Sequence, residues 1–100
     1  MDAREKEKMM LDRCVFVAQQ VNASACNGAE ANVFRLAGSV LRSRLPVEAS
    51  RLKTASANYF VSHPNEQLDT AEVVRRGLVV SMPRLRELLS RKLDWNGRHA

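Results

Sequence analysis

The chain has 100 residues, of which 45% are hydrophobic and 27% charged, with 4 Gly, 3 Pro and a formal net charge of +5. This composition excludes collagen-like, low-complexity and disordered chains, and the length is that of one domain. We therefore expect residues 1–100 to form a single domain with a modest core.

Several features predict a cytoplasmic protein without a membrane partner. The longest apolar run, Cys14 to Ala18, is too short to span a bilayer. The opening MDAREKEKMM has mixed charge and no apolar stretch, unlike a secretory signal. The two cysteines, Cys14 and Cys26, are too few for a disulfide framework and lack the CxxC spacing of zinc or redox motifs. We expect both to be free thiols.

The first predicted helix, about Ala3–Val21 within residues 1–22, has two apolar strips. Its main stripe, at helical spacing, consists of Met10, Leu11, Cys14, Val17, Ala18 and Val21. Met9 and Phe16 project from nearly the opposite side. A helix with two apolar strips has two surfaces to bury, so we predict a homodimer or a partner helix here. The alternative is that both strips belong to the core of one chain.

Two further helices are predicted over Gly28–Arg44 and Val47–Val61. Asn27 and Glu30 have the spacing of a capping box at the start of the former. Pro46 suits the first turn of the latter, where its missing N–H costs nothing. We expect His63 to interact with a helix C-terminus rather than with a metal.

The fourth predicted helix, Leu68–Val80, contains Gly77, which has two interpretations. Gly77 either permits a close contact within one helix or ends the helix at Arg76. The β-branched run Leu78–Val80 also permits a short strand.

The last predicted helix follows Ser81 as N-cap, contains Pro83 in its first turn and ends near Leu93. Residues 94–100 are predicted to be a frayed tail. Trp95, within that tail, either packs back on the core or anchors a partner.

The basic charge is concentrated in residues 76–100, which hold six Lys/Arg against two Asp/Glu. Such a cluster attracts anionic partners. Residues 68–93 also resemble a helix-turn-helix, with Val73, Gly77, Ser81, Leu85 and Leu88 at suggestive positions, although the GLVVS turn is long for that motif. The candidate contacts to DNA or to an acidic protein are Arg76, Arg84, Arg86, Ser90, Arg91 and Lys92.

Catalytic motifs are absent from the sequence: there is no GxSxG, HExxH, P-loop or GxGxxG. We therefore expect no enzyme, no cofactor, no metal site and no small-molecule substrate. The predicted fold is an all-α bundle of four to five short amphipathic helices, assembled as a homodimer. The predicted function is regulatory binding of another protein through a helix, as in anti-activators, chaperones or inhibitors. The alternative is a DNA-binding transcriptional regulator that uses residues 70–93. Contacts to a protein partner or second copy are assigned to Met9, Met10, Phe16, Val17 and Trp95.

Overall fold

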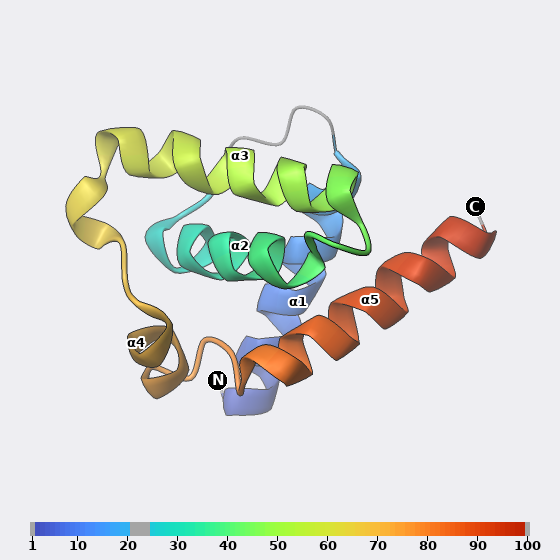
Figure 1. The fold of residues 1–100 in the computed structure, drawn as a ribbon. Coiled ribbons are helices and arrows are strands. Elements are labelled where there is room, and N and C mark those ends of the chain that lie inside the picture. The colour runs from blue at the N-terminus through green and yellow to red at the C-terminus, as the bar shows by residue number, and fades with distance from the viewer. Residues whose placement is uncertain (1, 21–24, 100) are drawn as a thin grey trace.

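The computed structural model describes residues 2–20 and 25–99, and for residues 3 and 94–99 it describes the backbone alone. The described residues form five α-helices and one 3₁₀ turn, with no strand, so the predicted all-α bundle is confirmed (Figure 1). Their bounds are α1 Ala3–Gln19, α2 Gly28–Leu41, α3 Pro46–Ser62, η1 Pro64–Glu66, α4 Thr70–Arg75 and α5 Met82–His99. The predicted homodimer is not visible in one chain and stays a prediction.

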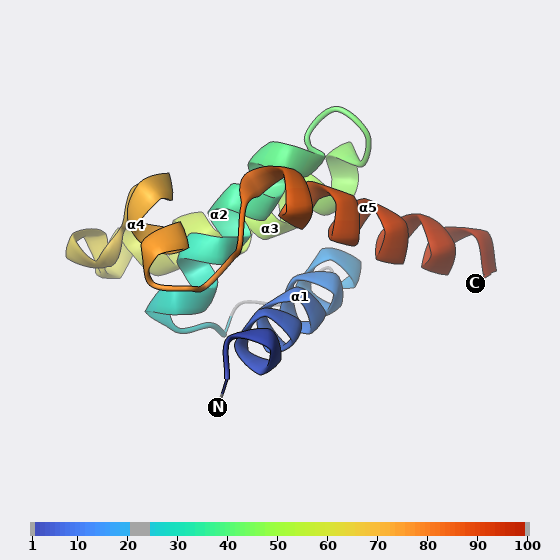
Figure 2. The same cartoon turned by 90° about the horizontal axis from the view of Figure 1, so that it is seen from below.

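Helix α2 is the centre of the fold and contacts α1, α3, α4 and α5. It begins at Gly28 as predicted, because the Asn27 side chain accepts from the Glu30 N–H and the Glu30 side chain accepts from the Asn27 N–H. Helices α2 and α3 run antiparallel side by side, while α1 and α5 cover the remaining faces of α2 (Figure 2). The central position explains why α2 is apolar on most of its surface.

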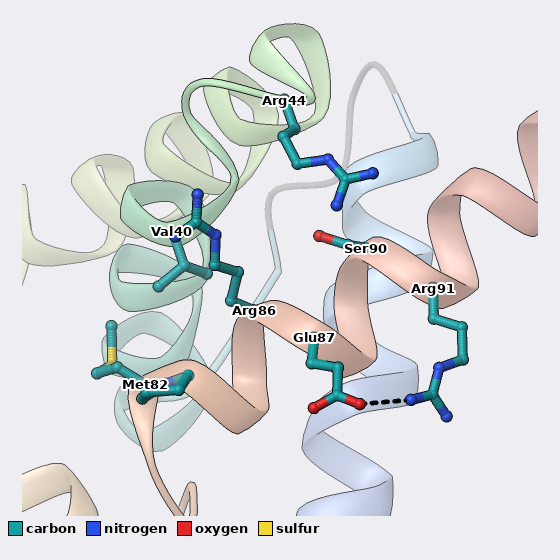
Figure 3. A pocket seen from close by; sticks show the side chains of 8 residues that line it. Val40, Arg44, Met82, Arg86, Glu87, Ser90 and Arg91 are labelled. Carbon is teal, nitrogen blue, oxygen red and sulfur yellow. Dashed lines mark hydrogen bonds and ion pairs between the residues drawn. The ribbon is translucent and has the colours of Figure 1, made fainter.

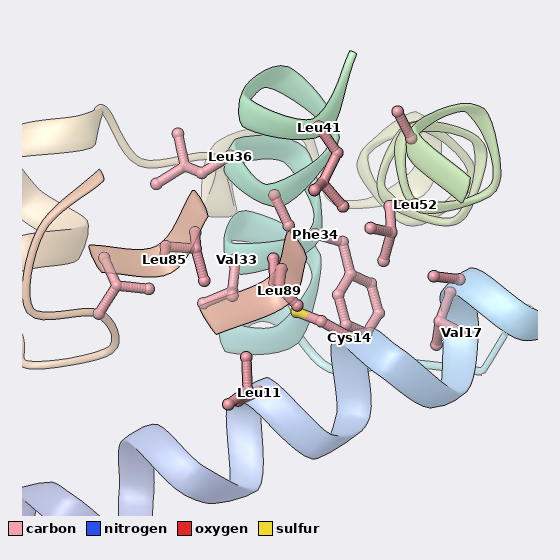
Figure 4. Packing of buried hydrophobic residues seen from close by; sticks show 14 of the residues in the cluster. Leu11, Cys14, Val17, Val33, Phe34, Leu36, Leu41, Leu52, Leu85 and Leu89 are labelled. Carbon is pink, nitrogen blue, oxygen red and sulfur yellow. The ribbon is translucent and has the colours of Figure 1, made fainter. Parts of the chain in front are cut away.

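Helix α1 ends at Gln19, two residues before the predicted end at Val21, which lies outside the described residues. The Asp2 carboxylate caps its start by accepting from the Glu5 N–H at 2.9 Å. The main predicted stripe is inside: Leu11, Cys14, Val17 and Ala18 are buried and Met10 is half-buried. These side chains meet those of α2, α3 and α5 in one core (Figure 4).

The segment after α3 is fixed to α2 by the buried amide of Asn32 and by Arg35, whose guanidinium donates to the Leu68 carbonyl. Asn32, which is 1% exposed, donates to the carbonyls of Gly28 and Glu66 and accepts from the Leu68 N–H. His63 follows the end of α3, where its ring stacks on Tyr59 at 4.2 Å between centroids. Asn32 and Arg35 together therefore hold the chain against α2 where it turns towards α4.

The prediction of one helix over Leu68–Val80 is wrong in its bounds, because α4 ends at Arg75. Helix α4 covers six residues and ends in a Schellman motif, in which the Gly77 N–H donates to the Val74 carbonyl and the Leu78 N–H to the Val73 carbonyl. Gly77 has φ +73°, and no atom lies within 4 Å of where its Cβ would be. Of the two interpretations of Gly77, the helix-ending one is right. The run Leu78–Val80 forms no strand.

Helix α5 starts as predicted, with the Ser81 hydroxyl accepting from the Arg84 N–H at 3.2 Å. It continues to His99, so the backbone of the predicted frayed tail is helical up to that residue. The continuation projects beyond the other helices (Figure 1). No side-chain position is described for Trp95, so its two interpretations stay open. In the described part of the chain, no helix is both long and apolar enough to cross a bilayer.

Candidate binding groove

Two of the predicted basic contacts join α5 to α1. The Arg84 Nε lies 2.6 Å from Glu7 Oε1, and the Lys92 Nζ lies 2.6 Å from Asp12 Oδ1. Together with the buried leucines of α5, these pairs fix one edge of the helix against the first helix. Their charges are thereby partly neutralised within the chain.

Two more basic candidates are paired within their own helical segments. The Arg76 Nε lies 2.8 Å from Glu72 Oε1, beside the Arg75 pair with the same carboxylate. Hydrogen bonds from Arg75 and Arg76 lower the pKa of Glu72 to about 2. On α5, Arg91 pairs with Glu87 at 2.6 Å. Pairs of this exposed kind are weak, and a stronger partner can exchange into them.

Arg86 differs from these four cations, because it makes no hydrogen bond or ion pair with any described residue. It is exposed and lines an open groove of about 590 Å³ between α5 and the C-terminal end of α2 (Figure 3). We call this cavity the α2–α5 groove. Its lining is Val40, Arg44, Met82, Pro83, Arg86, Glu87, Ser90 and Arg91.

The groove is amphipathic. Val40, Met82 and Pro83 provide apolar surface, and the guanidinium groups of Arg44, Arg86 and Arg91 provide positive charge. Glu87, the acidic residue of the lining, already pairs with Arg91. An occupant with apolar and negatively charged groups would match both parts of the lining.

Ser90 lies in this lining and is 5% exposed, with no hydrogen-bond partner for its Oγ. A buried hydroxyl without a partner costs about 1–3 kcal/mol. In Figure 3 the Ser90 hydroxyl points from α5 towards α2, below the guanidinium of Arg44. The hydroxyl is therefore a polar group that the chain itself leaves unsatisfied.

The predicted second strip of α1 is on the surface: Met9 is 56% and Phe16 49% exposed. They line a shallow depression, and the Arg13 guanidinium stacks over the Phe16 ring at 5.3 Å. Met10 is half-buried, whereas Val17 packs in the core and offers little surface to a partner. The structure thus separates these residues from the α2–α5 groove, to which α1 contributes no lining residue.

The geometry of residues 68–93 differs from a compact helix-turn-helix. Helix α4 has only six residues, and residues 76–81 connect it to α5. Both helices pack on α2. In a helix-turn-helix a short turn sets the angle at which the second helix enters the major groove. In this chain, the angle between α4 and α5 is set by their packing on α2 and by the ion pairs from α5 to α1.

Sequence reasoning missed five lining residues. Met82, Pro83 and Glu87 lie on α5, beside residues that were predicted, whereas Val40 and Arg44 come from α2 and the turn after it. Helical periodicity groups Val40 with the core face of its helix, and nothing in the sequence marks Arg44 at the helix end as a contact residue. Their meeting with α5 depends on tertiary packing across more than forty residues, for which the sequence holds no signal.

The described residues contain no cluster of three or more His, Cys, Asp or Glu that could hold a metal ion. Cys14 and Cys26 are free thiols, with Cys14 buried and Cys26 half-buried. Burial is the main cause that raises the pKa of both thiols. Raised values disfavour the thiolate and thus nucleophilic chemistry.

Comparison of this chain with models of protein families, with curated proteins and with solved structures finds no match.

Proposed function

We propose that this protein is a non-enzymatic binding protein whose α2–α5 groove takes an acidic, partly apolar segment of another protein. The observation that carries the proposal is the unpaired, exposed Arg86 beside the apolar surface of the α2–α5 groove. Binding of this kind regulates the partner, because the bound segment cannot contact other molecules while it occupies the groove.

Charge complementarity defines the occupant. The groove lining carries three arginines against one glutamate, and that glutamate is engaged by Arg91. A carboxylate on the partner can pair with Arg86 without breaking any bond of this chain. Such pairs raise the association rate and select against basic segments.

The apolar part of the lining favours a protein segment over duplex DNA. Val40, Met82 and Pro83 need apolar side chains against them, and a phosphate backbone has none to offer. DNA contacts through Arg84 and Lys92 would also compete with their pairs to α1. DNA binding is therefore the alternative that the following experiment distinguishes from peptide binding.

The test is selection from a library of random peptides against the immobilised chain, followed by affinity measurements on Arg86→Ala. We expect the enriched peptides to combine Asp or Glu with large apolar residues, and Arg86→Ala to weaken them about tenfold. The matched control is Arg42→Ala, since Arg42 is exposed, lies outside the groove lining and has no described partner.

Three results would overturn the proposal. One is the absence of any enriched peptide, and another is binding that does not respond to Arg86→Ala. The third is tight, salt-sensitive binding of a random duplex that Arg86→Ala removes, which would assign the groove to DNA.

The homodimer through α1 and the cytoplasmic location are also part of this proposal. Met9 and Phe16 are exposed and available for a second copy. Sedimentation tests the dimer: a mass that rises with concentration and returns to that of one chain in Phe16→Ser supports it. A concentration-independent mass of one chain refutes it.

A further inference from the structure

The Ser90 hydroxyl is buried and has no hydrogen-bond partner, whereas two exposed helical serines each have one. Ser39 donates to the Arg35 carbonyl four residues earlier, and Ser62 donates to the Tyr59 carbonyl. Ser90 has an equivalent carbonyl available at Arg86 but makes no such bond, and its Oγ is sealed from water. A buried hydroxyl without a partner carries a desolvation cost, which an acceptor bound beside it would reduce.

The surroundings of Ser90 determine what that partner would be. It lies one helical turn after Arg86 on α5, and both residues line the α2–α5 groove together with Arg44. Glu87, the acidic residue of the groove lining, is bonded to Arg91. A hydroxyl donor beside guanidinium groups calls for an acceptor with negative charge, that is, an oxyanion.

We infer that Ser90 and Arg86 form a carboxylate subsite inside the α2–α5 groove. One oxygen of an Asp or Glu side chain accepts from the Ser90 hydroxyl, and the carboxylate pairs with the Arg86 guanidinium. This subsite deepens the proposed function and rests on it for the source of the carboxylate. Its formation requires local movement of the side chains that cover the Ser90 Oγ, and Arg86 is exposed and able to move with the ligand.

The experiment combines a stability measurement with a binding measurement on Ser90→Ala. In the free protein the variant leaves the melting temperature unchanged or higher, because it removes an unsatisfied polar atom. Towards the selected acidic peptides the same variant weakens affinity about tenfold, the size expected for a lost hydrogen bond to a charged group. Ser39→Ala is the matched control, since that hydroxyl is already bonded and lies outside the groove.

Two further arms separate this inference from the proposed function. The first arm replaces each Asp or Glu of the peptide, one at a time, by Asn or Gln. At one position, the losses of binding free energy caused by this replacement and by Ser90→Ala must be non-additive. The second titrates N-acetyl-glutamate amide as a probe and follows backbone NMR signals, with shifts expected at Ser90 and Arg86.

The outcomes are distinguishable. Peptides that respond to Arg86→Ala but not to Ser90→Ala overturn the subsite and leave the proposed function intact. Shifts at Ser90 with N-acetyl-glutamate amide, in a protein that enriches no peptide, support the subsite and overturn the proposed function. A fall in melting temperature for Ser90→Ala also overturns the subsite, because it would show that the hydroxyl is already satisfied within the fold.

Discussion

The Asn32 amide provides the sharpest test of the fold that positions the groove. It is 1% exposed and makes three hydrogen bonds, at 2.8 Å to the Gly28 carbonyl, 3.0 Å to the Glu66 carbonyl and 2.7 Å from the Leu68 N–H. A net value of about 1 kcal/mol for each bond gives about 3 kcal/mol in total. Water can partly replace the bonds of the connecting segment, so we expect Asn32→Ala to lower the free energy of unfolding by about 2–3 kcal/mol.

The assay is urea denaturation, monitored by the far-UV circular dichroism signal of the helices. Asn65→Ala is the control, because Asn65 is exposed in η1 and makes no described hydrogen bond; we expect a change within about 0.5 kcal/mol. Asn32→Asp keeps the acceptor for the Leu68 N–H but turns a negative oxygen towards two carbonyls. It should destabilise the fold at neutral pH at least as much as Asn32→Ala. A loss below about 1 kcal/mol for Asn32→Ala would refute the reasoning that this amide holds the segment.

Three other properties can be measured on the same protein. Gly77→Ala should cost about 1–2 kcal/mol in urea denaturation, because φ +73° is strained for a side chain although space is open, and Gly77→Asn should cost less. The pKa of Glu72, held at about 2 chiefly by the hydrogen bond from Arg75, should rise towards 4.5 in NMR titrations of Arg75→Ala. Since that folded-state pKa is depressed, the pair stabilises the protein above about pH 4.5, and this contribution is lost as the pH falls towards about 2. Ellman's reagent should label Cys26 in the native protein but Cys14 only after unfolding, since Cys14 is fully buried; labelling of both at one rate would contradict the fold.

The start of most helices could be predicted from local capping chemistry. Two helix starts depend on residues that are close in sequence, and such local patterns can be read from the sequence. These residues are Asn27 and Glu30 for α2, and Ser81 and Pro83 for α5. Helix ends are harder to predict: α4 stops at Arg75 because Gly77 takes a positive φ, and the apolar residues after it pack without helical geometry. Residues 94–99 carried no apolar periodicity, yet α5 continues through them.

The candidate site was predictable only in part. Arg86, Ser90 and Arg91 were found from the basic face of the last helix. Helical periodicity could not show which cations form ion pairs within the chain. Arg84 pairs with a carboxylate 77 positions earlier in the sequence, and Lys92 with one 80 positions earlier. Ser90 was grouped with exposed arginines, but the crossing of α5 over α2 buries it. Long-range packing decides both outcomes.

The pairing of the first helix with the last has a consequence during synthesis. The N-terminal residues Glu7 and Asp12 leave the ribosome long before Arg84 and Lys92, so until α5 emerges they have no cations opposite them. The leucines of α5 that complete the core arrive equally late. At about 5–20 residues per second, α5 is synthesised a few seconds after α3, and α2 lacks its α5 neighbour during that interval. One wall of the groove comes with that late helix, so the groove is complete only after α5 has docked.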